Sequence, residues 1–137
     1  MDSHSIKTHS DSLIAPLLDP NPNRILILGA SGAIGFAFYE QICECYPDCE
    51  ITLLARDTNK LKTRINDRLT EQNAPKIIKI DLLSNDSIEQ ACSKIPKNLA
   101  IDLIFVASGW LHDNQTLPEK TWKSLEADNL VKAYQIN

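Results

Sequence analysis

Three of the chain's four glycines stand three residues apart in the segment Gly-Ala-Ser-Gly-Ala-Ile-Gly at 29–35. An apolar run precedes this segment, and a helical spacing of apolar residues follows it. Such a loop turns sharply and lets a phosphate group approach backbone N–H groups without meeting a Cβ atom. The dipole of the following helix adds positive potential at the same place. The segment therefore predicts a pyrophosphate-binding turn; the structural alternative is a tight glycine turn that binds nothing.

A second feature with chemical consequences lies about twenty residues beyond this turn, where dinucleotide-binding proteins read the adenosine ribose. An acidic residue there binds the 2′-hydroxyl of NAD, whereas an arginine accommodates the 2′-phosphate of NADP. This chain has Ala55 followed by Arg56 and Asp57. We therefore expect NADP(H) to bind in preference to NAD(H). Asp57 could weaken that preference or cap the next helix, and the alternative for Arg56 is an exposed surface cation.

Alternating strands and helices must position these residues. Short, nearly continuous apolar runs, typical of strands buried on both faces, predict strands at 24–28, 51–55, 76–80 and 101–107. Three- and four-residue apolar spacing predicts helices between them, the first with an apolar face formed by Ile34, Ala37, Phe38, Ile42 and Cys45. Leu61, Ile65 and Leu69 indicate a second helix, Ser84 is the expected N-cap of a third, and residues 127–136 form a fourth. Prolines fall between helix and next strand at Pro47, Pro75 and Pro96.

This alternation predicts an α/β fold, a Rossmann-type doubly wound parallel sheet that is incomplete, with about four strands and four helices. We expect residues 1–23 to be a flexible N-terminal arm and residues 24–137 to be a dinucleotide-binding half-domain. The length of 137 residues, with 43% hydrophobic and 23% charged residues, suits one domain with a real core.

Charge and cysteine content exclude several classes. A net charge of -4 without a basic run disfavours nucleic acid as a partner. No apolar run approaches the roughly 18 residues that a membrane span needs. The four cysteines fit neither a disulfide scaffold nor a zinc pattern, and no export signal accompanies them, so a cytoplasmic location without a metal site is expected.

Several segments together resemble the short-chain dehydrogenase/reductase family. Residues 26–35 resemble its cofactor loop, Asp81 and Leu82 its pair against the adenine, and residues 101–109 its fourth strand. More narrowly, residues 109–113, 118–120 and 134–137 look like the C-factor-like branch. The glycine loop and this resemblance together imply cofactor contacts from Gly29, Ser31, Gly32, Ile34, Gly35, Arg56, Asp81, Leu82, Ala107, Ser108 and Gly109.

The chain departs from the family pattern in three ways. Ala33 replaces a loop glycine, and Val106 and Ala107 stand where the family has two asparagines, for which Ser108 is a partial substitute. Asn137 matches the family's catalytic asparagine by its place at the end of the helix. None of the tyrosines, Tyr39, Tyr46 and Tyr134, is followed four residues later by lysine. The resemblance thus implies that this chain lacks the Ser and Tyr-x-x-x-Lys part of the machinery.

Three hypotheses for function follow from these residues. The first is the NADP(H)-binding portion of an oxidoreductase that acts on a carbonyl or alcohol substrate, inactive as this chain alone, with a second copy of the chain as a candidate partner in a homo-oligomer. The second is a non-catalytic dinucleotide-binding or C-factor-like signalling module. The third, an epimerase-like relative, shares the spaced glycines but is disfavoured by residues 109–113. His112 and Asp113 could move a proton, although adjacent loop residues seldom orient one another.

Overall fold

The computed structural model describes residues 21–67, 74–110, 113 and 120–137. Four parallel strands form one sheet in the order β3-β2-β1-β4. The strands are β1 (Arg24–Leu28), β2 (Glu50–Ala55), β3 (Lys76–Lys79) and β4 (Leu103–Val106). The helices that connect and follow them are α1 (Ala33–Cys45), α2 (Thr58–Asn66), α3 (Asn85–Ser93) and α4 (Ala127–Ile136). The predicted α/β class is therefore confirmed. Most of the expected arm, residues 1–20, lies outside the described residues.

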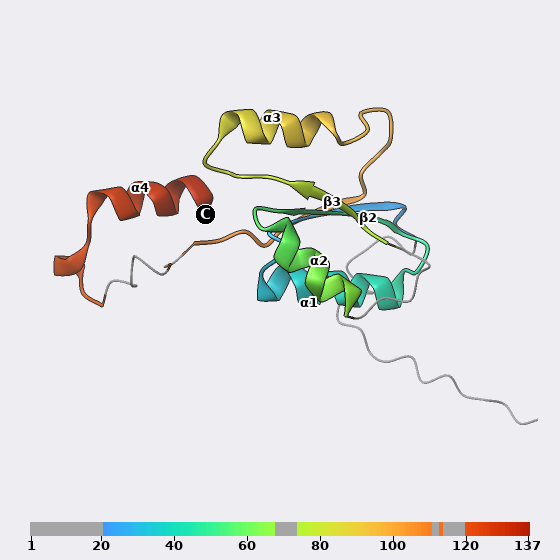
Figure 1. The fold of residues 1–137 in the computed structure, drawn as a ribbon, viewed down its shortest axis with the longest axis horizontal. Helices are drawn as coiled ribbons and strands as arrows, with labels where there is room; N and C mark the ends of the chain where they lie inside the picture. The colour runs from blue at the N-terminus through green and yellow to red at the C-terminus, as the bar shows by residue number, and fades with distance from the viewer. Residues whose placement is uncertain (1–20, 68–73, 111–112, 114–119) are drawn as a thin grey trace, which may run out of the picture.

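Helices cover both faces of the sheet, with α1 and α2 on one side and α3 on the other (Figure 1). Alternate residues of β1 serve the two sides, as the pleat of a strand requires. Ile25 and Ile27 belong to a core with Phe36, Tyr39, Ile42, Leu53, Leu61 and Ile65. Leu26 belongs to a second, smaller core with Leu54, Ile78, Ile80 and Ala91 under α3. Because both faces of β1 are buried, its sequence does not alternate between apolar and polar residues.

The apolar face predicted for α1 is wrong at two positions. Ile34 is 70% exposed and Ala37 is also exposed, whereas Gly35, Phe36, Tyr39 and Ile42 are buried. The cause lies at the start of the helix. A Cβ atom on Gly35 would lie 2.5 Å from the carbonyl oxygen of Gly29, so only a glycine fits against the turn there. This contact fixes the rotation of α1, and the residues that share the side of Gly35 become the buried face.

Side-chain caps mark the starts of α2 and α3. Asp57 accepts a hydrogen bond from the backbone N–H of Lys60, which confirms the capping alternative for this residue. Ser84 accepts from the N–H of Ser87 at 3.3 Å, as predicted. The second helix ends at Asn66, and Leu69, which was expected to continue it, lies outside the described residues.

The fourth strand is shorter than the predicted span 101–107 and lies at an edge of the sheet. Ile104 and Val106 are 58% and 61% exposed despite the apolar sequence. Ile104 and Val106 pair in register with Leu26 and Leu28, so they lie on the face of the sheet that α3 covers. However, α3 packs over β2 and β3, and it leaves β4 uncovered. Helix α4 lies beyond the sheet and buries none of its residues (Figure 1). Within the described part of the chain, no helix has the length and apolarity to cross a membrane.

Candidate dinucleotide site

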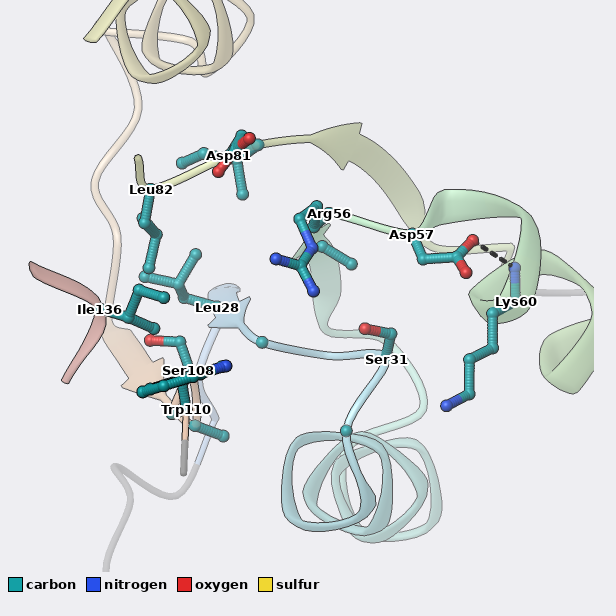
Figure 2. A pocket seen from close by; sticks show the side chains of 16 residues that line it. Leu28, Ser31, Arg56, Asp57, Lys60, Asp81, Leu82, Ser108, Trp110 and Ile136 are labelled. Carbon is teal, nitrogen blue, oxygen red and sulfur yellow. Dashed lines mark hydrogen bonds between the residues drawn. The ribbon is translucent and has the colours of Figure 1, made fainter. Parts of the chain in front are cut away.

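A pocket of about 330 Å³ opens at the carboxyl ends of the strands, where α/β proteins bind ligands (Figure 2). This volume lies within the range of small-molecule sites. Its walls come from the glycine turn, the ends of β2 and β3, the segment after β4 and the end of α4. The lining residues are Leu28, Gly29, Ser31, Gly32, Ala55, Arg56, Asp57, Lys60, Ile80, Asp81, Leu82, Ala107, Ser108, Gly109, Trp110 and Ile136.

Nine of the eleven residues predicted to contact a cofactor line this one pocket, although they span residues 29–109. The two exceptions are Ile34 and Gly35. Ile34 points away from the core on the first turn of α1, and Gly35 is buried against the glycine turn. Gly35 thus acts on the shape of the loop and not on the wall of the pocket. The contacts themselves remain predictions.

Gly29 is required for the turn by both conformation and space. Its φ of +82° lies in the left-handed region that residues with a Cβ rarely adopt. A Cβ atom there would lie 2.5 Å from the backbone nitrogen of Ser108 and 2.7 Å from the carbonyl carbon of Ala107. The backbone after β1 therefore touches the backbone after β4. This close approach brings the two halves of the pocket wall together.

The N-terminal end of α1 adjoins the pocket at Gly32. Gly32 is the N-cap residue, and as a glycine it has no side chain that could cap the helix. The first N–H groups of an α-helix have no partner within the helix, so those of α1 are available to a ligand. Gly32 has an ordinary backbone conformation, and a Cβ atom there would meet only the Gly29 carbonyl oxygen at 3.3 Å.

Two cations, Arg56 and Lys60, stand at the end of β2 and the first turn of α2. Figure 2 shows the Arg56 guanidinium directed into the pocket, and the hydrogen bond from Lys60 N–H that holds the Asp57 carboxylate at the helix start. On the other side, the Asp81 carboxylate accepts from the N–H of Leu83 at 3.0 Å. The Asp57 and Asp81 carboxylates therefore each accept a hydrogen bond from a nearby backbone N–H. At this end of the pocket, the Arg56 and Lys60 cations lie near these two hydrogen-bonded carboxylates.

Seven of the lining residues are outside the predicted set of contacts, although Ala55 and Asp57 were considered at the ribose position: Leu28, Ala55, Asp57, Lys60, Ile80, Trp110 and Ile136. Lys60 could have been predicted from the sequence. If Asp57 is the N-cap of the second helix, Lys60 lies on the first turn of that helix, four residues after Arg56 and beside the pocket. Ile136 carried no signal, because the contact of α4 with the pocket depends on a long connection.

The end of α4 is tied to the segment after β4. The Asn137 side chain accepts from the N–H of Trp110 at 2.6 Å and donates to the Trp110 carbonyl oxygen at 2.9 Å. Lys132 donates to the Asp113 carboxylate at 2.7 Å and lies 4.5 Å from the centre of the Trp110 ring. Asp113 therefore pairs with α4, and His112 lies outside the described residues. The catalytic role of Asn137 remains a prediction, and its side chain holds the pocket wall through Trp110.

None of the three tyrosines lines the pocket. Tyr39 is buried in the core and burial raises the pKa of its hydroxyl, whereas Tyr134 is 89% exposed on α4. Tyr46 is the C-cap residue of α1. The pocket as described therefore contains no phenol that could exchange a proton with a ligand.

The four cysteines differ in burial: Cys49 is buried, Cys43 and Cys45 are half-buried, and Cys92 is exposed. Burial, with the nearby Asp102 charge second, raises the pKa of the Cys49 thiol to about 11, and burial also raises that of Cys43. A raised thiol pKa means that the reactive thiolate is scarce below it, about one part in a thousand at pH 8 for Cys49. No cluster of three or more metal-ligating side chains occurs in the described residues.

We expect iodoacetamide at pH 8 to alkylate the exposed Cys92 while Cys49 stays unmodified. Peptide mass spectrometry over a time course measures both rates. In urea, where burial is lost, the two thiols should react at similar rates. Equal labelling of Cys49 and Cys92 in the folded protein would contradict this prediction.

Comparison with known proteins identifies the family. The model of the NAD dependent epimerase/dehydratase family matches residues 25–134. No curated protein matches the chain. Among solved structures, an oxidoreductase from E. coli has a TM-score of 0.66 at 23% identity. The match covers 85% of this chain and 46% of the E. coli chain. A gluconate 5-dehydrogenase from Burkholderia cenocepacia, solved with NADP and tartrate, has a TM-score of 0.63 at 19% identity, covering 85% and 43%.

The chain thus spans less than half the length of these structures. At such identities they show the fold alone, a Rossmann-like α/β arrangement. The family match carries more, because it extends from β1 through most of α4 and includes the whole glycine turn. The chain belongs to the NAD dependent epimerase/dehydratase family.

Proposed function

We propose that this chain is the nicotinamide dinucleotide-binding portion of an oxidoreductase and prefers NADP(H). One observation carries the proposal: the glycine turn, the uncapped start of α1 and the Arg56 cation all face the same pocket. The family match supports a nicotinamide dinucleotide as the ligand, and one structural neighbour was solved with NADP.

The phosphate groups of the dinucleotide would lie at the glycine turn. The free N–H groups at the start of α1 donate to phosphate oxygens, and the helix dipole favours negative charge at this end. Gly32 lines the pocket without a side chain, so a phosphate can approach the backbone closely. The residues present therefore fit a pyrophosphate.

The adenosine would lie between the ends of β2 and β3. Leu82 and Ile80 offer an apolar wall, and Arg56, which lines the same pocket, would pair with a 2′-phosphate. The Asp57 carboxylate accepts from the Lys60 N–H and so caps α2. Because that carboxylate is already hydrogen-bonded, we infer that it competes weakly for a ribose hydroxyl, and Arg56 and Lys60 set the preference.

The nicotinamide, when bound, supplies or accepts hydride, and we propose a carbonyl or alcohol carbon as the other partner. Trp110 and Ile136 line the opposite end of the pocket and would exclude water from the ring. A non-catalytic dinucleotide-binding module is a second candidate, favoured by the lack of a tyrosine in the pocket lining. The C-factor-like branch remains a proposal that rests on residues 109–113, 118–120 and 134–137.

The proposal is tested by titration calorimetry with NADP⁺ and NAD⁺ on the wild type and on Arg56→Ala. A charge-assisted hydrogen bond contributes about 1.5–3 kcal/mol, so NADP⁺ should bind about ten- to a hundredfold more tightly than NAD⁺. Arg56→Ala should remove most of this difference and leave NAD⁺ affinity nearly unchanged.

Lys62→Ala is the matched control, because Lys62 is an exposed cation of α2 that does not line the pocket. Equal wild-type affinities for the two dinucleotides would overturn the NADP preference. Binding of neither would overturn the proposed function. An NADPH-oxidation assay with a panel of aldehydes and ketones then separates the oxidoreductase from the non-catalytic module.

A further inference from the structure

Arg64, on α2, contacts the glycine turn from outside the pocket. Its Nη1 atom donates to the carbonyl oxygen of Ser31 at 3.2 Å and to that of Gly32 at 3.4 Å. Its guanidinium carbon lies 3.8 Å from the centre of the Phe36 ring, which is itself 1% exposed. Arg64 does not line the pocket, so it would touch the loop and not the ligand.

These contacts help to fix which way the loop's peptide groups face, together with the Phe36 N–H, which donates to the Gly32 carbonyl oxygen at 3.1 Å. A peptide group is planar and trans, so its carbonyl and its N–H point in opposite directions. With the Gly32 carbonyl held toward Arg64, the Ala33 N–H at the start of α1 points away from it. The Gly32 N–H is also fixed, because it donates to the Gly29 carbonyl oxygen at 3.1 Å. Arg64 thus stabilises one orientation of the loop in which carbonyl oxygens and helix N–H groups are separated.

Charge makes this orientation matter for an anion. Two carbonyl oxygens at the phosphate loop carry partial negative charge, which would oppose a phosphate if they turned toward it. The guanidinium compensates that charge and keeps the oxygens engaged. Lys60 and Arg64 are four residues apart and share one face of α2. The same helix therefore contributes one cation to the pocket wall and another to the back of the loop.

We propose that Arg64 is a positioning residue for pyrophosphate binding, which holds the glycine turn in its phosphate-binding orientation through the Ser31 and Gly32 carbonyls. The proposal rests on the proposed dinucleotide function for its ligand, but the effect on the loop is independent of any ligand.

The test compares Arg64→Met, which keeps an unbranched side chain over Phe36, with Lys62→Met, which removes an exposed cation from the same helix. Amide hydrogen exchange on the ligand-free proteins is followed in peptides covering residues 29–36 and 50–55. Arg64→Met should accelerate exchange in residues 29–36 about tenfold and leave residues 50–55 unchanged. Lys62→Met should leave both unchanged, and Arg64→Lys should restore part of the protection.

Calorimetry with NADP⁺ and with adenosine 2′-monophosphate, which has no pyrophosphate, measures the consequence. Arg64→Met should weaken NADP⁺ binding about tenfold and change adenosine 2′-monophosphate binding less than twofold. Equal losses for both ligands, or exchange identical to that of Lys62→Met, would overturn the proposal. If the wild type binds neither ligand, the proposed function fails, and the exchange experiment alone still decides whether Arg64 holds the loop.

Discussion

Replacing Gly29 by valine is expected to destabilise the protein and to abolish dinucleotide binding together. The positive φ at this position is costly for a β-branched residue, and its Cβ would collide with backbone atoms of Ala107 and Ser108. Backbone atoms cannot move aside by changing rotamer, so the ends of β1 and β4 must separate. We expect the free energy of unfolding to fall by about 3 kcal/mol or more, measured by urea denaturation.

Two other glycines provide controls for this variant. Gly32→Ala introduces only the 3.3 Å contact with the Gly29 oxygen, and Gly109→Ala an ordinary 3.5 Å contact with the Asn137 side chain. Gly109→Ala should fold with nearly wild-type stability. Gly32→Ala should lose some stability, because alanine is a poorer N-cap than glycine, but far less than Gly29→Val. It should also weaken NADP⁺ binding, because its methyl group enters the pocket wall. A Gly29→Val protein with wild-type stability and NADP⁺ affinity would show that the turn has no such requirement.

The strands and helices could be predicted because their signals are local. The apolar runs of β1 and β2 are short stretches of sequence whose residue types alone indicate buried strands. The serine at position 84 likewise marks the start of α3 by its residue type. The glycine turn, Arg56 and the Asp81–Leu82 pair meet at one pocket, and this could also be predicted, since parallel strands bring their carboxyl ends to one edge.

What could not be predicted depends on contacts between distant residues. Arg64 contacts Ser31 and Gly32 of the glycine turn, which precede it in the sequence by 33 and 32 residues. Nothing in the local sequence distinguishes Arg64 from Lys62 on the same helix. The wrong face assigned to α1 has the same origin, because the Gly35 contact with the turn sets the rotation of the helix. The spacing of apolar residues alone placed Ile34 on the buried face of α1, whereas its side chain is exposed in the structure.

The exposed side of β4 leads to a prediction about association. Ile104 and Val106 carry apolar surface on the open face, and β4 pairs only with β1 within the described residues. An edge strand with unpaired backbone groups beside exposed apolar side chains tends to recruit another strand. We therefore expect the 137-residue chain to associate with itself through residues 101–107, as dimers or as larger aggregates.

Replacing Ile104 by lysine should suppress this association, because a charge on an edge strand opposes strand addition. Ile104 is exposed, so the substitution should change the free energy of unfolding by less than about 0.5 kcal/mol. Light scattering and sedimentation velocity over a range of concentrations measure the effect. Leu130→Lys is the matched control, since Leu130 is 51% exposed and belongs to α4 and not to the sheet. A wild-type chain that stays monomeric at high concentration, or a Leu130→Lys variant that dissociates as readily as Ile104→Lys, would exclude β4 as the site of association.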